Sequence, residues 1–223
     1  MTIPRWILNN YTAAINKVSS SAQDSVARTL TAIDLTDDVA TVRQSVVEVM
    51  QGVCALATDT VAALSAEFYD GIRERELGSR INARASSGRV PKATEEAVRA
   101  FADKLVKGDP VAFEDLVLSR IDYEVKVASA MATLNAGKYD PVPPKFARVP
   151  TGDETCAFCL MLASRGFVYR NLEAASHAHA NCDCRVVPAW NVKDPRDPTL
   201  VEGYDPREIY DRWDAIVHGE DEE

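Results

Sequence analysis

Residues 37–75 read DDVATVRQSVVEVMQGVCALATDTVAALSAEFYDGIRER, and this stretch decides the fold. Its apolar residues recur in steps of three or four, which keeps one face of a helix apolar: Val39, Val42, Val46, Val49, Val53, Ala57, Val61, Leu64, Phe68 and Ile72. Thr36 is the expected N-cap, and the two aspartates after it form an acidic first turn. A helix from residue 37 to Arg75 is about 58 Å long at ~1.5 Å per residue. Such a length suits an elongated assembly protein better than a compact enzyme.

Further helices are predicted on both sides of this stretch. One occupies residues 4–31, a loop follows the long helix at 77–91, and two more helices begin at Thr94 and Asp109. Gly137 stands where a helix-ending residue belongs. The apolar face of the long helix favours an intramolecular bundle, although a coiled coil or a partner subunit would use the same face. We therefore expect a mainly helical domain over residues 1–138.

Prolines mark the end of this helical domain. They remove backbone donors and bias the residues before them away from helix, and they stand at Pro141, Pro143, Pro144 and Pro150. We expect a small Cys/His α+β module over residues 139–190, stabilised by zinc. Residues 191–223 then form a C-terminal segment with a short helix, which Asp205 and Pro206 begin, and an acidic tail. The fold class predicted for the whole chain is α+β.

Two pairs of ligand residues with the same spacing define the Cys/His module. Cys156 and Cys159 form a C-x2-C pair, and His179 and Cys182 repeat the spacing with histidine in first place. Each two-residue loop lets both of its side chains point inward, so two such loops supply four ligands to a tetrahedral zinc ion. Cys184 could replace Cys182, because residues two apart in an extended segment share a face. His177 is a weaker alternate ligand.

The alternative interpretation is that these cysteines are small buried side chains in a reduced core. Four of the five cysteines and two of the three histidines fall within residues 156–184, and such clustering favours a metal. Four protein ligands leave no open position for water, so the predicted zinc is structural. A helix after the second cysteine, closed by Gly166, and paired strands at 167–169 and 185–187 complete the predicted module.

Three quoted stretches carry a resemblance to a known family: FARVPTG at 146–152, CAFCLMLASRG at 156–166 and HANCDCRVVP at 179–188. They resemble the C-terminal motif of the phage Mu F-like minor head proteins, in the form seen in phages and prophages of actinobacteria. The resemblance implies a minor capsid protein that is incorporated in few copies during head morphogenesis. It also implies a place inside the capsid near the portal vertex, with the portal protein as usual partner and the major capsid protein as a further one.

Charge limits the expected contact with nucleic acid. The formal net charge is -9 and the pI is about 4.9, so a DNA contact would have to be local. Residues 78–92 contain no acidic residue and carry four basic ones that could contact packaged DNA or an acidic portal surface: Arg80, Arg84, Arg89 and Lys92. A solvated loop is the alternative interpretation of this stretch.

The sequence also predicts where the protein is made. No secretory signal is recognisable, and charges interrupt every apolar run of 18 residues, so we expect synthesis in the host cytoplasm and no membrane contact. The final location implied by the resemblance is the virion.

Two other function classes were weighed. A nuclease of the His-metal finger type would use His177, His179 and Asn181, but the spacing commits His179 to the structural ion. A zinc deaminase is excluded because no H-x-E precedes the cysteine pair. We therefore predict that the chain is not an enzyme. A cellular zinc-ribbon adaptor is the third class, and only the family resemblance argues against it.

Overall fold

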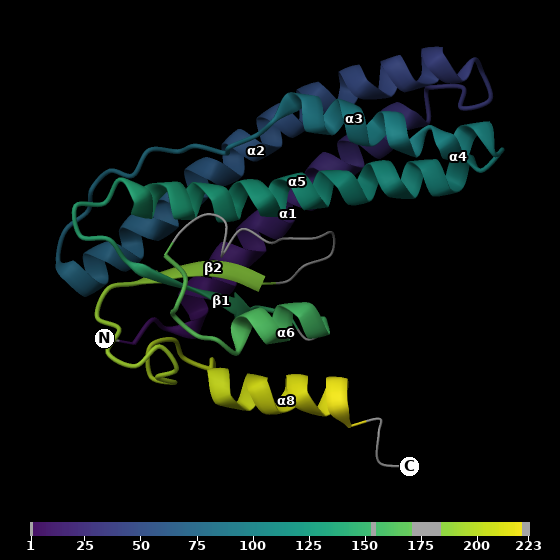
Figure 1. Cartoon of the computed structure of the whole chain (residues 1–223). Coiled ribbons are helices and arrows are strands. Elements are labelled where there is room, and N and C mark those ends of the chain that lie inside the picture. The colour runs from purple at the N-terminus through teal and green to yellow at the C-terminus, as the bar shows by residue number, and fades with distance from the viewer. Residues whose placement is uncertain (1, 153–154, 171–183, 220–223) are drawn as a thin grey trace.

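The computed structural model of the 223-residue chain describes residues 2–152, 155–170 and 184–219. Long helices run side by side and form one layer, and a small sheet with two shorter helices lies against them (Figure 1). The chain is therefore a mainly helical α+β protein, as the sequence predicts.

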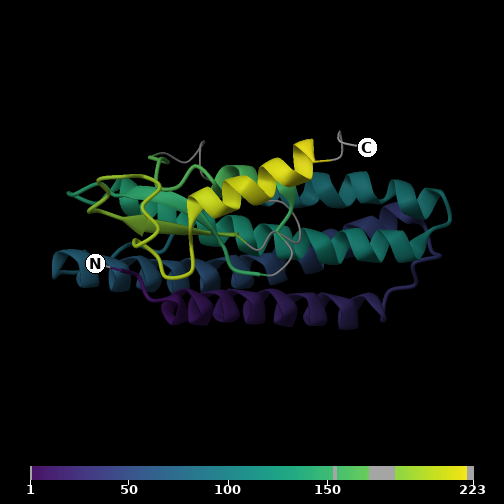
Figure 2. The same cartoon turned by 90° about the horizontal axis from the view of Figure 1, so that it is seen from below.

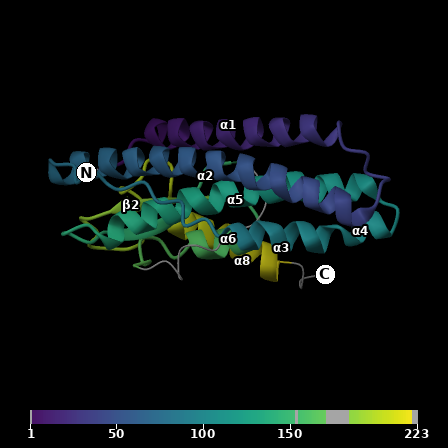
Figure 3. The same cartoon turned by 90° about the horizontal axis from the view of Figure 1, so that it is seen from above.

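Three helices form the main bundle: α1 (Arg5–Leu30), α2 (Val39–Leu77) and α5 (Pro110–Lys138). Each of the three packs against the other two, and α2 is the longest (Figure 3). Two shorter helices, α3 (Pro91–Phe101) and α4 (Asp103–Val106), lead back toward α5. The predicted apolar face of α2 is confirmed, because Val46, Val61 and Ile72 are fully buried.

The predicted helix starts need two corrections. Asp38, and not Thr36, caps α2, since its carboxylate accepts a hydrogen bond from the backbone N–H of Thr41. The helix expected from Thr94 begins three residues earlier, at Pro91. Proline is tolerated in the first helical turn, because the N–H groups there have no partner within the helix. Thr94 is buried instead and donates its hydroxyl to Glu124 at 2.6 Å.

The length and composition of α2 would also allow a membrane span, with a mean hydropathy of 1.3 over an 18-residue window. Charged residues do interrupt its apolar run, at Glu48, Asp59 and Glu67, and the criterion allows up to two of them in the window. The core helix of a soluble protein meets the same criterion, and α2 lies between α1 and α5. Of that window 39% is buried in the described structure, and one helix of this kind is weak evidence for a membrane.

The sheet has two antiparallel strands, β1 (Lys145–Pro150) and β2 (Cys184–Ala189). The expected pairing of 167–169 with 185–187 is wrong. β1 lies in the proline-rich stretch at the start of the predicted module, where no strand was expected, and it pairs with β2. Tyr169 bridges to the other edge of β1 at Phe146. Three apolar residues of β1, Phe146, Ala147 and Val149, are buried, and their burial outweighs the nearby prolines.

Hydrogen-bond alternation explains how Pro188 fits inside β2. Pro188 stands opposite Phe146, whose N–H and C=O both bond to Tyr169 on the other side, at 2.8 and 3.1 Å. The Phe146–Pro188 pair is therefore a non-hydrogen-bonded pair of the ladder, and the N–H that proline lacks is not needed there.

Two further helices complete the smaller layer. α6 (Ala157–Ala163) packs against β1, and α8 (Pro206–His218) packs against α6. The predicted start of α8 is confirmed, because the Asp205 carboxylate accepts a hydrogen bond from the backbone N–H of Arg207. Seen from below, α8 and α1 lie on opposite sides of the molecule (Figure 2).

One cluster of buried apolar residues crosses the expected boundary between residues 138 and 139. It joins Ile15, Val61 and Ile121 of the long helices to Val149 and Leu160 of the smaller layer. The two ends of the described chain also meet, since the backbone N–H of Ile3 donates to Leu200 and its carbonyl accepts from Glu202. The sheet and α6 are therefore built onto the bundle.

Candidate functional site

The first cysteine pair lies at the start of α6. Cys156 is its N-cap residue with an extended backbone, and its Sγ accepts a hydrogen bond from the backbone N–H of Cys159 at 3.4 Å. A sulfur that accepts such a bond is held in a fixed direction, which suits a thiolate ligand. Cys156 is exposed, whereas Cys159 is buried.

The strand β2 brings a third cysteine to the same place. Cys184 is its first residue and stands opposite Pro150 at the end of β1. Cys184 is buried and packs against Cys159, and the two form a small cluster separate from the main core. The fold therefore brings Cys184 to Cys159, which is 25 positions earlier in the sequence and donates a hydrogen bond to Cys156.

The other predicted ligands, His177, His179 and Cys182, lie outside the described residues. Within the part of the chain that the structure describes, Cys, His, Asp and Glu side chains do not gather in groups of three that could hold a metal ion. The zinc site therefore stays a prediction, and the described residues show the contact of Cys159 with Cys184 and the hydrogen bond from Cys159 to Cys156.

Two buried arginines lie beside these cysteines, and sequence reasoning missed them. Arg148 on β1 and Arg185 on β2 are 1% and 2% exposed. Arg185 donates to the side-chain oxygen of Asn16 on α1 at 2.7 Å and to the carbonyl of Cys184 at 3.2 Å. A buried guanidinium must be hydrogen-bonded or paired, so Arg185 fastens the start of β2 to the bundle.

The four basic residues of the predicted contact patch do not form one exposed patch of unpaired positive charge. Arg80 pairs with Glu67 at 2.5 Å, Arg89 with buried Glu124 at 3.7 Å, and Lys92 with Glu96 at 3.6 Å. Their acidic partners belong to α2, α5 and α3. Arg84 is exposed and makes no ion pair with any residue that the structure describes. A contact with DNA or a portal surface through these residues remains untested.

A buried ion pair holds the loop after α2 and the start of the smaller layer together. The Asp140 carboxylate accepts hydrogen bonds from Arg73 at 2.8 and 3.2 Å, from Tyr69 at 2.8 Å and from the N–H of Val142 at 2.8 Å. Burial alone would raise the pKa of Asp140, but these hydrogen bonds lower it overall. The Arg73 guanidinium also donates to Ser79, so the pair fixes the chain where it leaves α2.

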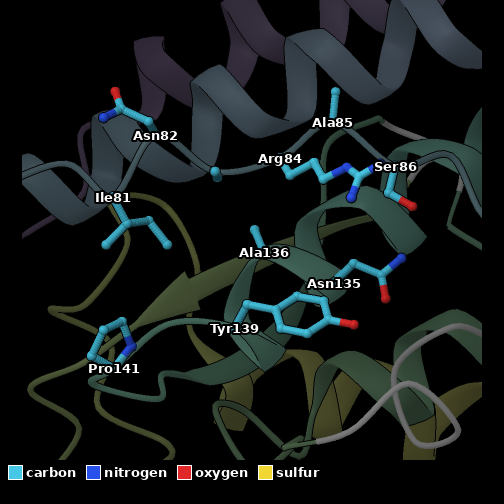
Figure 4. Close-up of a pocket in the computed structure, with 10 residues that line it drawn as sticks. Ile81, Asn82, Arg84, Ala85, Ser86, Asn135, Ala136, Tyr139 and Pro141 are labelled. Atoms are coloured by element: carbon cyan, nitrogen blue, oxygen red, sulfur yellow. The ribbon is translucent and has the colours of Figure 1, made fainter.

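A surface cavity of about 820 Å³ lies between residues 81–86 and the C-terminal end of α5 (Figure 4). Arg84 and Asn82 stand on one wall, and Asn135 and Tyr139 on the other. The sequence pattern gave no signal for this cavity, because its walls are more than 40 residues apart.

The comparisons with known proteins point to phages of mycobacteria. The Gene 15 protein of Mycobacterium phage L5 is 33% identical over 126 residues, which cover 38% of this chain and 42% of that protein. The Gene 15 protein of Mycobacterium phage D29 is 36% identical over 104 residues, with 31% and 38% covered. The matched region thus spans about two-fifths of each of these relatives. No solved structure matches the chain.

A family model covers almost the whole chain. The model described as VG15 protein matches residues 2–216, which include all the long helices, the cysteines and most of α8. This match extends well beyond the motif at residues 146–188 that carries the resemblance to phage head proteins, and the phage relatives agree with it. The chain therefore belongs to the VG15 protein family, a phage head-related family of the actinobacterial phage type.

Proposed function

We propose that this chain is a non-enzymatic minor capsid protein of a tailed phage, located inside the head near the portal vertex. The observation that carries the proposal is the family match over residues 2–216, combined with the head-protein motif at 146–188. The portal protein is the proposed partner, with the major capsid protein as a second one. The name Gene 15 protein states no role, so the assignment as a minor capsid protein rests on the motif and the family.

The proposed location is tested by quantitative mass spectrometry of purified phage heads. The protein is expected in few copies per particle, protected from protease until the head is opened. A pull-down with purified portal protein tests the partner, and purified major capsid protein is the comparison. Absence from particles together with failure to bind portal would contradict the proposal, and so would metal-dependent cleavage of DNA by the purified chain.

We further propose that the cysteines hold one structural zinc ion. Cys156, Cys159 and Cys184 fit this role, because Cys159 donates a hydrogen bond to the sulfur of Cys156 and packs against Cys184. His179 and Cys182 are the proposed remaining ligands, of which one completes a four-ligand set, and His177 is the alternate. A structural zinc contributes folding free energy to the module and leaves no open position for a reacting water.

Elemental analysis of protein purified without added zinc tests this site. One zinc per chain is expected, and Cys159→Ser is expected to lose it. Cys54→Ser is the matched control, since Cys54 is a buried cysteine in the helical core, away from the module. A folded wild-type protein without metal, or full zinc retention by Cys159→Ser, would overturn the proposed site.

A further inference from the structure

The chain after α2 runs antiparallel to that helix, and its backbone is left-handed at Asn82 (φ 54°) and Gly88 (φ 62°). The Asp70 carboxylate accepts hydrogen bonds from the backbone N–H groups of Ile81 and Ala83, at 3.0 and 2.8 Å. Further along, Gln51 donates to the carbonyl of Pro91 at 2.7 Å. The part of α2 from Gln51 to Asp70 spans about 28 Å at ~1.5 Å per residue. The eight residue steps from Ala83 to Pro91 span about 26 Å when fully extended at ~3.3 Å per residue.

Beyond Ala83, the backbone of this segment has an unpaired stretch. The N–H and C=O groups of Asn82, Arg84, Ala85 and Ser86 make no hydrogen bond with any residue in the described ranges, and all four residues are exposed. An extended chain with free donors and acceptors is a template for a further strand. The segment is held in place by Asp70, so its free side is presented in a fixed conformation.

The free stretch faces the 820 Å³ cavity, whose far wall is the end of α5 (Figure 4). Tyr139 on that wall is 75% exposed. The Asn135 side chain points into the same region and has no hydrogen-bond partner among the described residues. Ala136 and Pro141 add small apolar surface. The cavity thus has room beside the backbone for side chains, and a polar amide that can bond to an incoming main chain.

The charge of this surface is positive, in contrast to the chain as a whole. Arg84 has no ion-pair partner in the described structure, and Lys138 lies 5.5 Å from the centre of the Tyr139 ring. Among the nearby acids, Asp140 is buried against Arg73, and Asp70 accepts two backbone hydrogen bonds. On the exposed face of α2, Glu67 pairs with Arg80 and Asp59 accepts a hydrogen bond from Ser87. A partner that lies here therefore gains from carrying carboxylates.

We propose that residues 82–86 and the end of α5 form a groove that binds an extended acidic peptide segment of a partner protein. The segment adds as a strand to the free backbone, one carboxylate pairs with Arg84, and an apolar side chain lies against Tyr139. A nucleic acid strand fits less well, because the net charge is -9 and two basic side chains neutralise few phosphates. The groove is defined by its own chemistry, so its test is independent of portal binding.

The probe is a fluorescein-labelled peptide of alternating glutamate and valine, titrated with the full chain and followed by fluorescence anisotropy. Binding is expected to weaken at least tenfold in Arg84→Glu. Lys92→Glu is the matched control, since Lys92 is a basic residue just beyond the same segment but outside the cavity. The affinity of this variant for the peptide is expected to stay within twofold of wild type. Amide exchange at residues 82–86 is expected to slow when the peptide binds.

A second peptide, N-methylated on alternate backbone nitrogens, separates strand pairing from simple charge attraction. It keeps every carboxylate but loses the donors that a strand needs, so its binding is expected to fall at least tenfold. Equal affinity for both peptides would overturn the proposal. Tighter binding of a single-stranded oligonucleotide than of the acidic peptide would overturn it too, and so would equal loss of binding in Lys92→Glu.

Discussion

The buried pair of Arg73 and Asp140 makes the most demanding prediction about stability. Their side chains are 6% and 0% exposed, and Asp140 receives four hydrogen bonds in all. The change Asp140→Asn keeps the shape of the side chain but removes its charge. The Arg73 cation then remains buried beside a neutral amide. Loss of one partner from a buried ion pair costs about 3–5 kcal/mol, a large part of the about 5–15 kcal/mol that stabilises a typical domain.

Urea unfolding followed by circular dichroism at 222 nm measures this loss. Asp103→Asn is the control, because Asp103 pairs with Lys107 at the surface, where both side chains are more than half exposed. Exposed pairs contribute only about 0–1 kcal/mol. The midpoint for Asp140→Asn is therefore expected to fall clearly below that of the control.

A double variant completes this test. Arg73→Met with Asp140→Asn removes both charges. Its loss of unfolding free energy is therefore expected to be smaller than the sum of the losses in the two single variants. The reasoning would be refuted if the free energy of unfolding of Asp140→Asn lay within about 1 kcal/mol of the wild-type value. It would also be refuted if the losses in the two single variants added up to the loss in the double variant.

The remaining predictions concern pH, glycines and the core thiol. The pKa of Asp140 in the folded protein lies below its unfolded value of about 3.9, so the contribution of Asp140 to the free energy of unfolding is complete above about pH 5 and is lost as the pH falls. Urea midpoints measured from pH 7 to 3 are therefore expected to drop more in wild type than in Asp140→Asn. Gly166→Ala is expected to destabilise the fold by at least ~1–2 kcal/mol, because φ is +72° and the new Cβ would meet the carbonyl of Pro195. Gly52→Ala, in mid-helix with open space, is expected to raise stability by about 0.5–1 kcal/mol in the same assay. Burial raises the pKa of Cys54 to about 12, so its alkylation by iodoacetamide at pH 8 is expected to require unfolding, and fast labelling in the native protein would contradict this.

The long helices could be predicted because their periodicity is local. The steps of three and four in α2 fix its buried face without reference to any other element, and Asp109 and Pro110 mark the start of α5 in the same local way. β1 could not be predicted, because its strand conformation depends on pairing with residues 34 to 44 positions later. The prolines around it gave a local signal for a linker, and the tertiary pairing overrode that signal.

In the candidate site, too, local features could be predicted from the sequence, and contacts between distant residues could not. The spacing of Cys156 and Cys159 predicts that the two residues lie close together, and the backbone N–H of Cys159 donates to the sulfur of Cys156. The burial of Arg185 could not be foreseen, because its partner Asn16 is 169 positions away. The pairing of Arg80 with Glu67 was missed for a similar reason, since a window over residues 78–92 contains no acid and the partner lies on the helix before it.

The meeting of Ile3 with Val201 has a consequence for the order of events during synthesis. Ile3 and Arg5 bond to Leu200 and Glu202, so the start of α1 gains these partners only after nearly all of the described chain has been made. At ~5–20 residues per second, about 10–40 s pass between the synthesis of these two ends. For that time the start of α1 has none of these partners. Until then α1 is held in place by its packing against α2 and α5.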